Sequence, residues 1–177
     1  MKPFLAAIDR LSFVCSRAAM VMILGLVFSM LFEVVARYAF NAPTIWSYDV
    51  SYMLNGSLFI LGAAWTLANN NHVRIDFLSG RLPVPTQHAT NLIFYVLLFL
   101  PALGLATYAA IGEAWSAAVT GKLESVSPWK PKVWPFYTAL AIGLAALWLQ
   151  SLAETVRHAI GWRDPAAVRA PTVAGAH

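Results

Sequence analysis

The stretch "VWPFYTALAIGLAALWLQSLA", residues 133–153, runs for 21 residues without a charged side chain. About 20 mostly apolar residues in an α-helix cross the ~30 Å hydrocarbon core of a bilayer. Pro135 suits the first turn of such a helix, where its missing N–H costs no hydrogen bond. The stretch therefore predicts a membrane-spanning helix, which we place at about residues 133–155.

Three more stretches of similar character precede it. We expect them to span the membrane at about residues 14–36, 48–68 and 88–112. Pro101 falls inside the last of these and predicts a kink, because a proline within a helix removes a backbone hydrogen bond. The chain is thus predicted to be an all-α integral membrane protein with four transmembrane helices.

The composition supports this class. The 177 residues are 59% hydrophobic and only 11% charged, whereas a typical soluble domain is about 25% charged. A soluble fold of this size could not bury so much apolar surface. We expect one four-helix membrane domain over residues 1–164, followed by a disordered tail, residues 165–177, that is rich in Ala, Pro and Val.

The distribution of ionisable residues argues against several kinds of function. The formal charge is +4, but the basic residues lie at the ends of apolar runs, which does not favour nucleic-acid binding. The single cysteine, Cys15, permits no intrachain disulfide and no cysteine metal site. No histidine lies in the middle of a span, so a bis-histidine haem is not expected. We predict no enzyme activity, no catalytic residue, no metal and no cofactor.

The orientation follows from the positive-inside rule. Eight of the twelve Lys and Arg residues lie in the amino terminus, the connection between spans two and three, and the carboxyl tail. Basic residues are enriched in cytoplasmic loops. We therefore predict that both termini are cytoplasmic, in a multi-pass protein of the bacterial inner membrane.

Two acidic residues flank the turn between the first two spans. Glu33 precedes Arg37 by four positions, which is the favourable order for a helical ion pair. Glu33 could instead be a proton or coupling-ion site, but the ion pair is the preferred interpretation. After the turn, Thr44 or Ser47 can cap the second helix, and Asp49 lies near its positive end.

Aromatic and small residues suggest where the spans meet the interface and each other. Trp46 suits the headgroup level of the bilayer. Ser51, Asn55 and Gly62 share roughly one face of the second span, and Ala139, Gly143 and Ala146 form a small face on the fourth. Small residues let helices approach closely. We expect these faces to pack within the four-helix unit, in preference to contact with another subunit.

The polar stretch "NNNHVRIDFLSGRLP", residues 69–83, connects spans two and three. Its alternation resembles a strand, but an isolated strand at a bilayer surface would leave its edges unpaired. As a helix it forms an apolar stripe, so a short amphipathic helix in the interface is the better interpretation. His72, Arg74 and Asp76 are then expected to anchor this helix and dock another subunit.

The connection between spans three and four contains several prolines and aromatic residues, which predict a rigid interfacial elbow. Four of its residues are predicted to contact a binding protein: Trp129, Lys130, Lys132 and Trp134.

The segment "FEVVARYAFNAPTIWSYDVSYMLNGSLFILGAAWTLANNNHVRIDFL", residues 32–78, resembles the small membrane subunit, DctQ type, of tripartite ATP-independent periplasmic (TRAP) transporters. The matching positions are Glu33, Arg37, Tyr38, Phe40, Asn41, Pro43, Trp46, Ser47, Asp49, Leu61, Gly62, Ala63, Ala64, His72, Val73, Arg74, Ile75 and Asp76. Tyr48 departs from the pattern, since many members have an acidic residue there. "LANNN" also departs, since many members carry an Arg before the His.

The resemblance implies a non-catalytic scaffold subunit. In this family a periplasmic substrate-binding protein delivers an organic anion, often a carboxylate, to a large multi-span permease subunit coupled to sodium. The small subunit binds and stabilises that permease, with membrane lipid around both. Within this hypothesis, Glu33 and Arg37, with the turn from Trp46 to Asp49, are expected to hold the hairpin of the first two spans on the periplasmic side. Structural or subunit-docking roles are expected for Asn55 and Gly62 as well. The alternative is a self-sufficient homodimeric carrier that uses Glu33 as its proton site.

Overall fold

The computed structural model describes residues 2–69 and 92–163, and this part of the chain is helical with four helices long and apolar enough to cross a membrane. The helices are α1 (Lys2–Ala39), α2 (Ser47–Ala68), α5 (Leu100–Thr120) and α6 (Trp134–Arg163), and a π-turn, η1 (Tyr95–Phe99), leads into α5. The prediction of an all-α membrane protein with four spans is confirmed. The predicted interfacial helix lies almost wholly outside the described residues.

The outer helices extend further than the apolar stretches predicted. α1 begins at Lys2 rather than near residue 14, and α6 ends at Arg163 rather than near residue 155. The uncharged runs indicate only the part of each helix that lies in the hydrocarbon core. The helix itself can continue beyond the core, where charged residues are tolerated. At ~1.5 Å per residue the 38 residues of α1 extend for about 57 Å, so this helix must tilt or project beyond the ~30 Å core.

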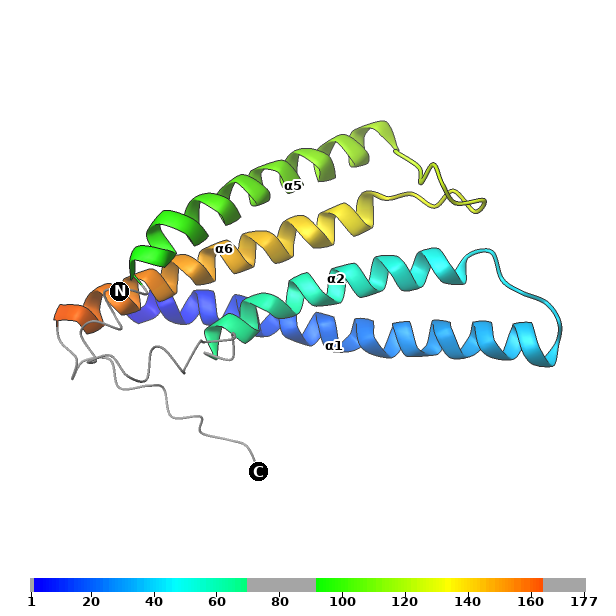
Figure 1. Cartoon of the computed structure of the whole chain (residues 1–177), viewed down its shortest axis with the longest axis horizontal. Helices are drawn as coiled ribbons and strands as arrows, with labels where there is room; N and C mark the ends of the chain where they lie inside the picture. Colours follow the sequence, from blue (N-terminus) through cyan, green and yellow to red (C-terminus); the bar gives the residue numbers. More distant parts are fainter. Residues whose placement is uncertain (1, 70–91, 164–177) are drawn as a thin grey trace, which may run out of the picture.

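The helices are arranged in the order α1, α2, α6, α5 (Figure 1). α2 packs between α1 and α6, α5 packs on the other side of α6, and α1 packs more extensively on α2 than on α6. The buried apolar cluster lies where α1, α2 and α6 meet. Its members are Cys15, Ala19, Leu61, Ala64, Leu67, Ala146 and Leu147.

Two glycines allow the close approach of α2 to α6. A Cβ on Gly143 would lie 2.7 Å from Ile60 Cγ2 and about as close to the Ile60 backbone, and a Cβ on Gly56 would lie 2.8 Å from the Phe136 ring. The predicted small face of the fourth span therefore does pack against the second span. On the expected face of the second span, Ser51 is buried as predicted, but the prediction is wrong for Asn55, which is exposed, and for Gly62, which has open space beside it.

The start of the third span is irregular at the place where Pro101 was expected to have an effect. The Leu100 N–H donates to the carbonyl oxygen of Tyr95, five residues back, and Pro101 has no N–H to donate. The wider π-turn thus accommodates the proline in a helix that continues to Thr120.

Candidate functional site

Polar side chains gather at the two ends of the bundle. The connector 40–46 and the loop 121–133 lie at one end, which we call the loop end (Figure 1). The beginning of α1 and the end of α6 lie at the other, which we call the terminal end. Each end contains a separate set of hydrogen bonds between elements.

Glu33 joins α1 to the connector at the loop end. Its Oε1 accepts hydrogen bonds from Arg37 Nε at 2.9 Å and from an Arg37 terminal nitrogen at 2.5 Å, so the predicted i, i+4 ion pair is present. Its Oε2 accepts from the Thr44 backbone N–H at 3.0 Å and from the Thr44 hydroxyl. The carboxylate thus holds both the end of α1 and the backbone of the turn that follows.

The expected helix cap on α2 is wrong. Residue Trp46 occupies the N-cap position, and no side chain caps it. Thr44 bonds Glu33 instead, and the Ser47 hydroxyl donates to the Ser29 carbonyl oxygen at 3.1 Å. Trp46 packs its ring 5.6 Å from the Phe32 ring, between centroids. These side chains therefore fix α2 against α1 rather than terminate the helix.

Asp49 joins α2 to the loop 121–133. Its side chain is buried, and its Oδ2 accepts a hydrogen bond from the Ser127 hydroxyl. The Ser127 oxygen in turn accepts from the Trp129 backbone N–H at 3.1 Å. A cleft of about 330 Å³ opens beside this contact, lined by Asp49 and Ser127 together with apolar side chains that include Tyr48 and Tyr52.

The loop 121–133 is a compact hairpin. Gly121 ends α5 with a left-handed φ of 63°, which glycine adopts without steric cost. The Glu124 N–H donates to the Pro131 oxygen at 2.9 Å, and the Val133 N–H donates to the Lys122 oxygen at 3.1 Å. These bonds support the expectation of a rigid elbow.

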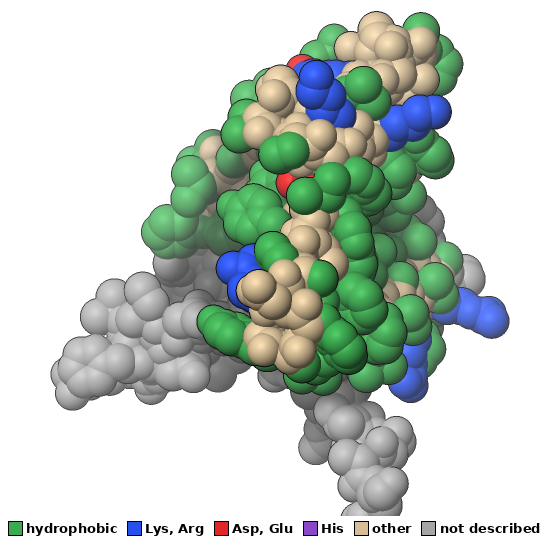
Figure 2. All heavy atoms as spheres, turned by 90° about the vertical axis from the view of Figure 1, so that its right-hand side faces the viewer, with side chains coloured by type: hydrophobic (Ala, Val, Ile, Leu, Met, Phe, Trp, Pro, Cys, Tyr) green, Lys and Arg blue, Asp and Glu red, His purple; other side chains and the backbone are tan. Residues whose placement is uncertain are grey.

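The surface of the loop end mixes cationic and aromatic groups. The Glu113 carboxylate lies 3.2 Å from Lys122 Nζ and raises the pKa of that amine. The four residues predicted to contact a binding protein are all exposed: Trp129, Lys130, Lys132 and Trp134. In Figure 2, which looks onto this end, Lys and Arg side chains stand among hydrophobic ones.

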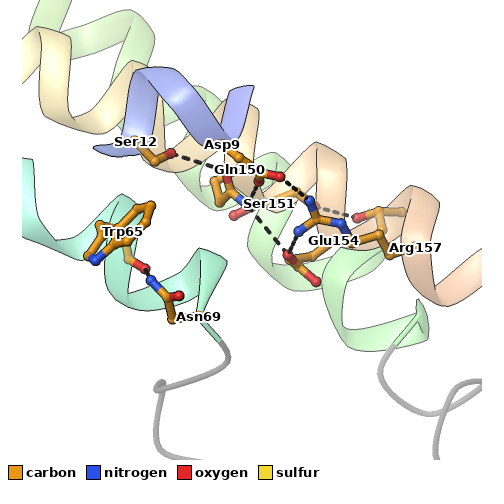
Figure 3. Close-up of polar contacts among 9 residues, drawn as sticks. Asp9, Ser12, Trp65, Asn69, Gln150, Ser151, Glu154 and Arg157 are labelled. Atoms are coloured by element: carbon orange, nitrogen blue, oxygen red, sulfur yellow. Dashed lines mark hydrogen bonds and ion pairs between the residues drawn. The ribbon is translucent and has the colours of Figure 1, made fainter. Parts of the chain in front are cut away.

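The terminal end contains a largely buried polar network, which joins α1 to α6 (Figure 3). The Ser12 hydroxyl donates to Gln150 Oε1 at 3.0 Å, and Gln150 Nε2 donates to Asp9 Oδ1 at 3.1 Å. Arg157 donates to Asp9 Oδ2 at 2.6 Å and to the Glu154 carboxylate. We call these five residues the terminal network.

Sequence reasoning missed the terminal network. Ser12 and Gln150 are fully buried, yet 138 positions separate them. A signal was present in the spacing, because Gln150, Glu154 and Arg157 recur at i, i+4 and i+7 on one face of a helix. Nothing in the sequence indicated that Asp9 and Ser12 would lie opposite that face.

His72, Arg74 and Asp76 lie outside the described residues.

Within residues 2–69 and 92–163, no group of three or more His, Cys, Asp or Glu side chains could hold a metal ion. The carboxylates at the two ends, on Glu33, Asp49, Asp9 and Glu154, are each occupied by partners in the same chain.

Comparison with known proteins gives the class of this molecule. The family "Tripartite ATP-independent periplasmic transporters, DctQ component" matches residues 26–161, which include most of the four spans. The chain belongs to this family and is a multi-pass membrane protein, a small-subunit component of a TRAP transporter.

One curated relative is a longer protein. The sialic acid TRAP transporter permease protein SiaT of Haemophilus influenzae (strain 86-028NP) is 29% identical over 68 residues. These cover 38% of this chain and only 11% of SiaT. The chain therefore corresponds to a small part of that permease.

Proposed function

We propose that this chain is a scaffold subunit that binds and stabilises a large, ion-coupled permease subunit, without carrying substrate itself. Membership of the DctQ family is the observation that carries this proposal. A periplasmic substrate-binding protein would deliver the substrate to the assembled pair. Both termini would be cytoplasmic, in the inner membrane, which places the loop end on the periplasmic side.

The contacts of the described carboxylates support a scaffold role. A coupling-ion or proton site needs an acid that can change its partner during the transport cycle. Glu33 instead accepts hydrogen bonds from Arg37 and from both the backbone and the hydroxyl of Thr44. Asp49 likewise holds the loop through Ser127. Both carboxylates hold a connecting segment against a helix, which is expected of a rigid subunit.

The proposed substrate is an organic anion of the carboxylate type, driven by a sodium gradient. The matched relative is named as a sialic acid transporter permease, which agrees with this chemical class. The residues that choose the substrate would lie in the large subunit and in the binding protein. Trp129, Lys130, Lys132 and Trp134 are exposed at the loop end, where a periplasmic protein could contact them.

Omission of single components in proteoliposomes tests this proposal. We expect sodium-driven uptake from the complete set of small subunit, large subunit and binding protein, and none from the small subunit alone. Uptake by the isolated small subunit would contradict the proposal and support the homodimeric carrier. In the complete transporter, Glu33→Gln should retain ion coupling, whereas the carrier hypothesis requires that it abolish coupling.

The segment that contains His72, Arg74 and Asp76 is proposed as a docking element for the large subunit. Replacing Arg74 or Asp76 by Ala should lower the yield of the complex and leave substrate specificity unchanged. The reverse result would assign these residues to substrate recognition.

A further inference from the structure

One face of α2 is largely uncovered, although the Tyr52 ring on it lies 5.5 Å from the Phe136 ring of α6, between centroids. Residues 48, 52, 55, 59, 62 and 66 follow one another at alternating intervals of four and three, the spacing of the apolar seam in a coiled coil. These positions are Tyr48, Tyr52, Asn55, Phe59, Gly62 and Thr66. All are exposed except Gly62, which is half-buried, and we call this face the α2 seam.

The α2 seam differs in composition from the exposed face of α1, which carries large apolar side chains such as Leu24, Phe28 and Leu31. Those side chains suit contact with lipid tails. The α2 seam instead offers an amide, a glycine and a threonine in the central and later part of the span. Small and polar residues of this kind are enriched where membrane helices pack on one another.

Asn55 is the residue of the α2 seam that most strongly indicates contact with another helix. It is the ninth of the 22 residues of α2, so it lies about 4 Å from the middle of the helix at ~1.5 Å per residue. Its amide has no hydrogen-bond partner among the described residues. Hydrocarbon cannot satisfy an exposed amide, so Asn55 needs a hydrogen-bond partner from another protein.

A groove that can accept another helix begins one turn after Asn55. This groove of about 420 Å³ runs between α1 and α2 and is lined by Ser16, Ala19 and Ile23 of α1 and by Phe59, Gly62 and Thr66 of α2. A Cβ added to Gly62 would meet nothing within 4 Å, so the backbone of α2 is open to close approach there. A transmembrane helix with a small surface can enter this groove along the seam.

We propose that the α2 seam is the surface that binds a transmembrane helix of the large permease subunit, with a polar side chain of that helix bonded to Asn55. The inference rests on the proposed function, because the family supplies the partner. It adds the location of the contact and the chemistry of the facing side chain, which must offer a hydrogen bond within the membrane.

Cross-linking in membranes that contain the complete transporter locates the contact. In a Cys15→Ser background, Phe59→Cys carries a thiol-directed photo-crosslinker, and Phe28→Cys on the outer face of α1 is the matched control. We expect an adduct with the large subunit from position 59 and none from position 28. Dimers of the small subunit, no protein adduct, or equal adducts at both positions would overturn the assignment.

Two substitutions test the chemistry of the seam. Asn55→Leu should weaken association with the large subunit about threefold to tenfold, which is the usual range for a hydrogen bond between membrane helices. It should leave the thermal unfolding of the isolated chain unchanged, because the amide makes no hydrogen bond within residues 2–69 and 92–163. Gly62→Leu should also weaken association, whereas Gly112→Leu, which fills equally open space on α5, should not.

The outcomes separate the two proposals. If the wild-type chain binds no large subunit, the proposed function fails and this inference fails with it. If the wild-type complex forms and Asn55→Leu and Gly62→Leu bind as tightly as wild type, only the inference about the seam is overturned.

Discussion

The two ends of the bundle are held together by different kinds of contact. At the loop end, Glu33 and Asp49 bond hydroxyl and backbone groups of the connector and loop, so each contact fixes an irregular segment onto a helix. At the terminal end, the bonds run between α1 and α6, two helices that pack less extensively on each other than on α2. The contacts at the loop end therefore hold irregular segments in place, whereas the contacts at the terminal end join α1 directly to α6.

The largest effect is expected at the terminal end. Arg157→Gln removes the cation that bridges Asp9 and Glu154, and leaves two facing carboxylates, one of them almost fully buried. We expect a loss on the order of 3 kcal/mol in the free energy of unfolding, measured in detergent. Arg10→Gln, an exposed arginine on α1, is the control and should change it by less than about 0.5 kcal/mol.

A triple variant tests whether uncompensated charge causes this loss of stability. If Asp9→Asn and Glu154→Gln are added to Arg157→Gln, no uncompensated charge remains, and most of the lost stability should return. A triple variant as unstable as the single one would mean that the network acts through shape rather than charge.

An intermediate effect is expected between the ends, where α2 and α6 approach most closely. Gly143→Ala places a Cβ against the Ile60 backbone and should cost about 1–3 kcal/mol. Gly112→Ala meets open space and should gain up to ~1 kcal/mol from helix propensity. Thermal unfolding of both variants checks this, and equal shifts would show that the helices are not in close contact at Gly143.

The smallest effect is expected at the loop end. Ser127→Ala removes the hydroxyl that serves Asp49 and the Trp129 N–H, and should cost about 1–2 kcal/mol. Hydrogen exchange should become faster at the Trp129 amide and little changed in α1. Ser125→Ala, an exposed position in the same loop, should change neither quantity, and identical exchange in the two variants would contradict the assigned contact.

The same contrast explains what could be predicted from the sequence. The Glu33–Arg37 pair joins residues four apart, and local spacing was sufficient to find it. The number of spans followed from the lengths of uncharged runs. The bond between Ser12 and Gln150 depends on how distant helices meet, which no local pattern encodes. The expectation that Asn55 is packed internally was wrong for the same reason. The sequence shows which residues share a helix face, but it does not show which helix packs against that face.

The most direct test of the central claim is affinity purification of the tagged full-length chain from native membranes. A scaffold subunit of a TRAP transporter should bring down a much larger multi-span membrane protein in a fixed ratio, and the isolated small subunit should show no sodium-driven uptake. Recovery of the chain alone or only as copies of itself, together with transport activity, would contradict this account.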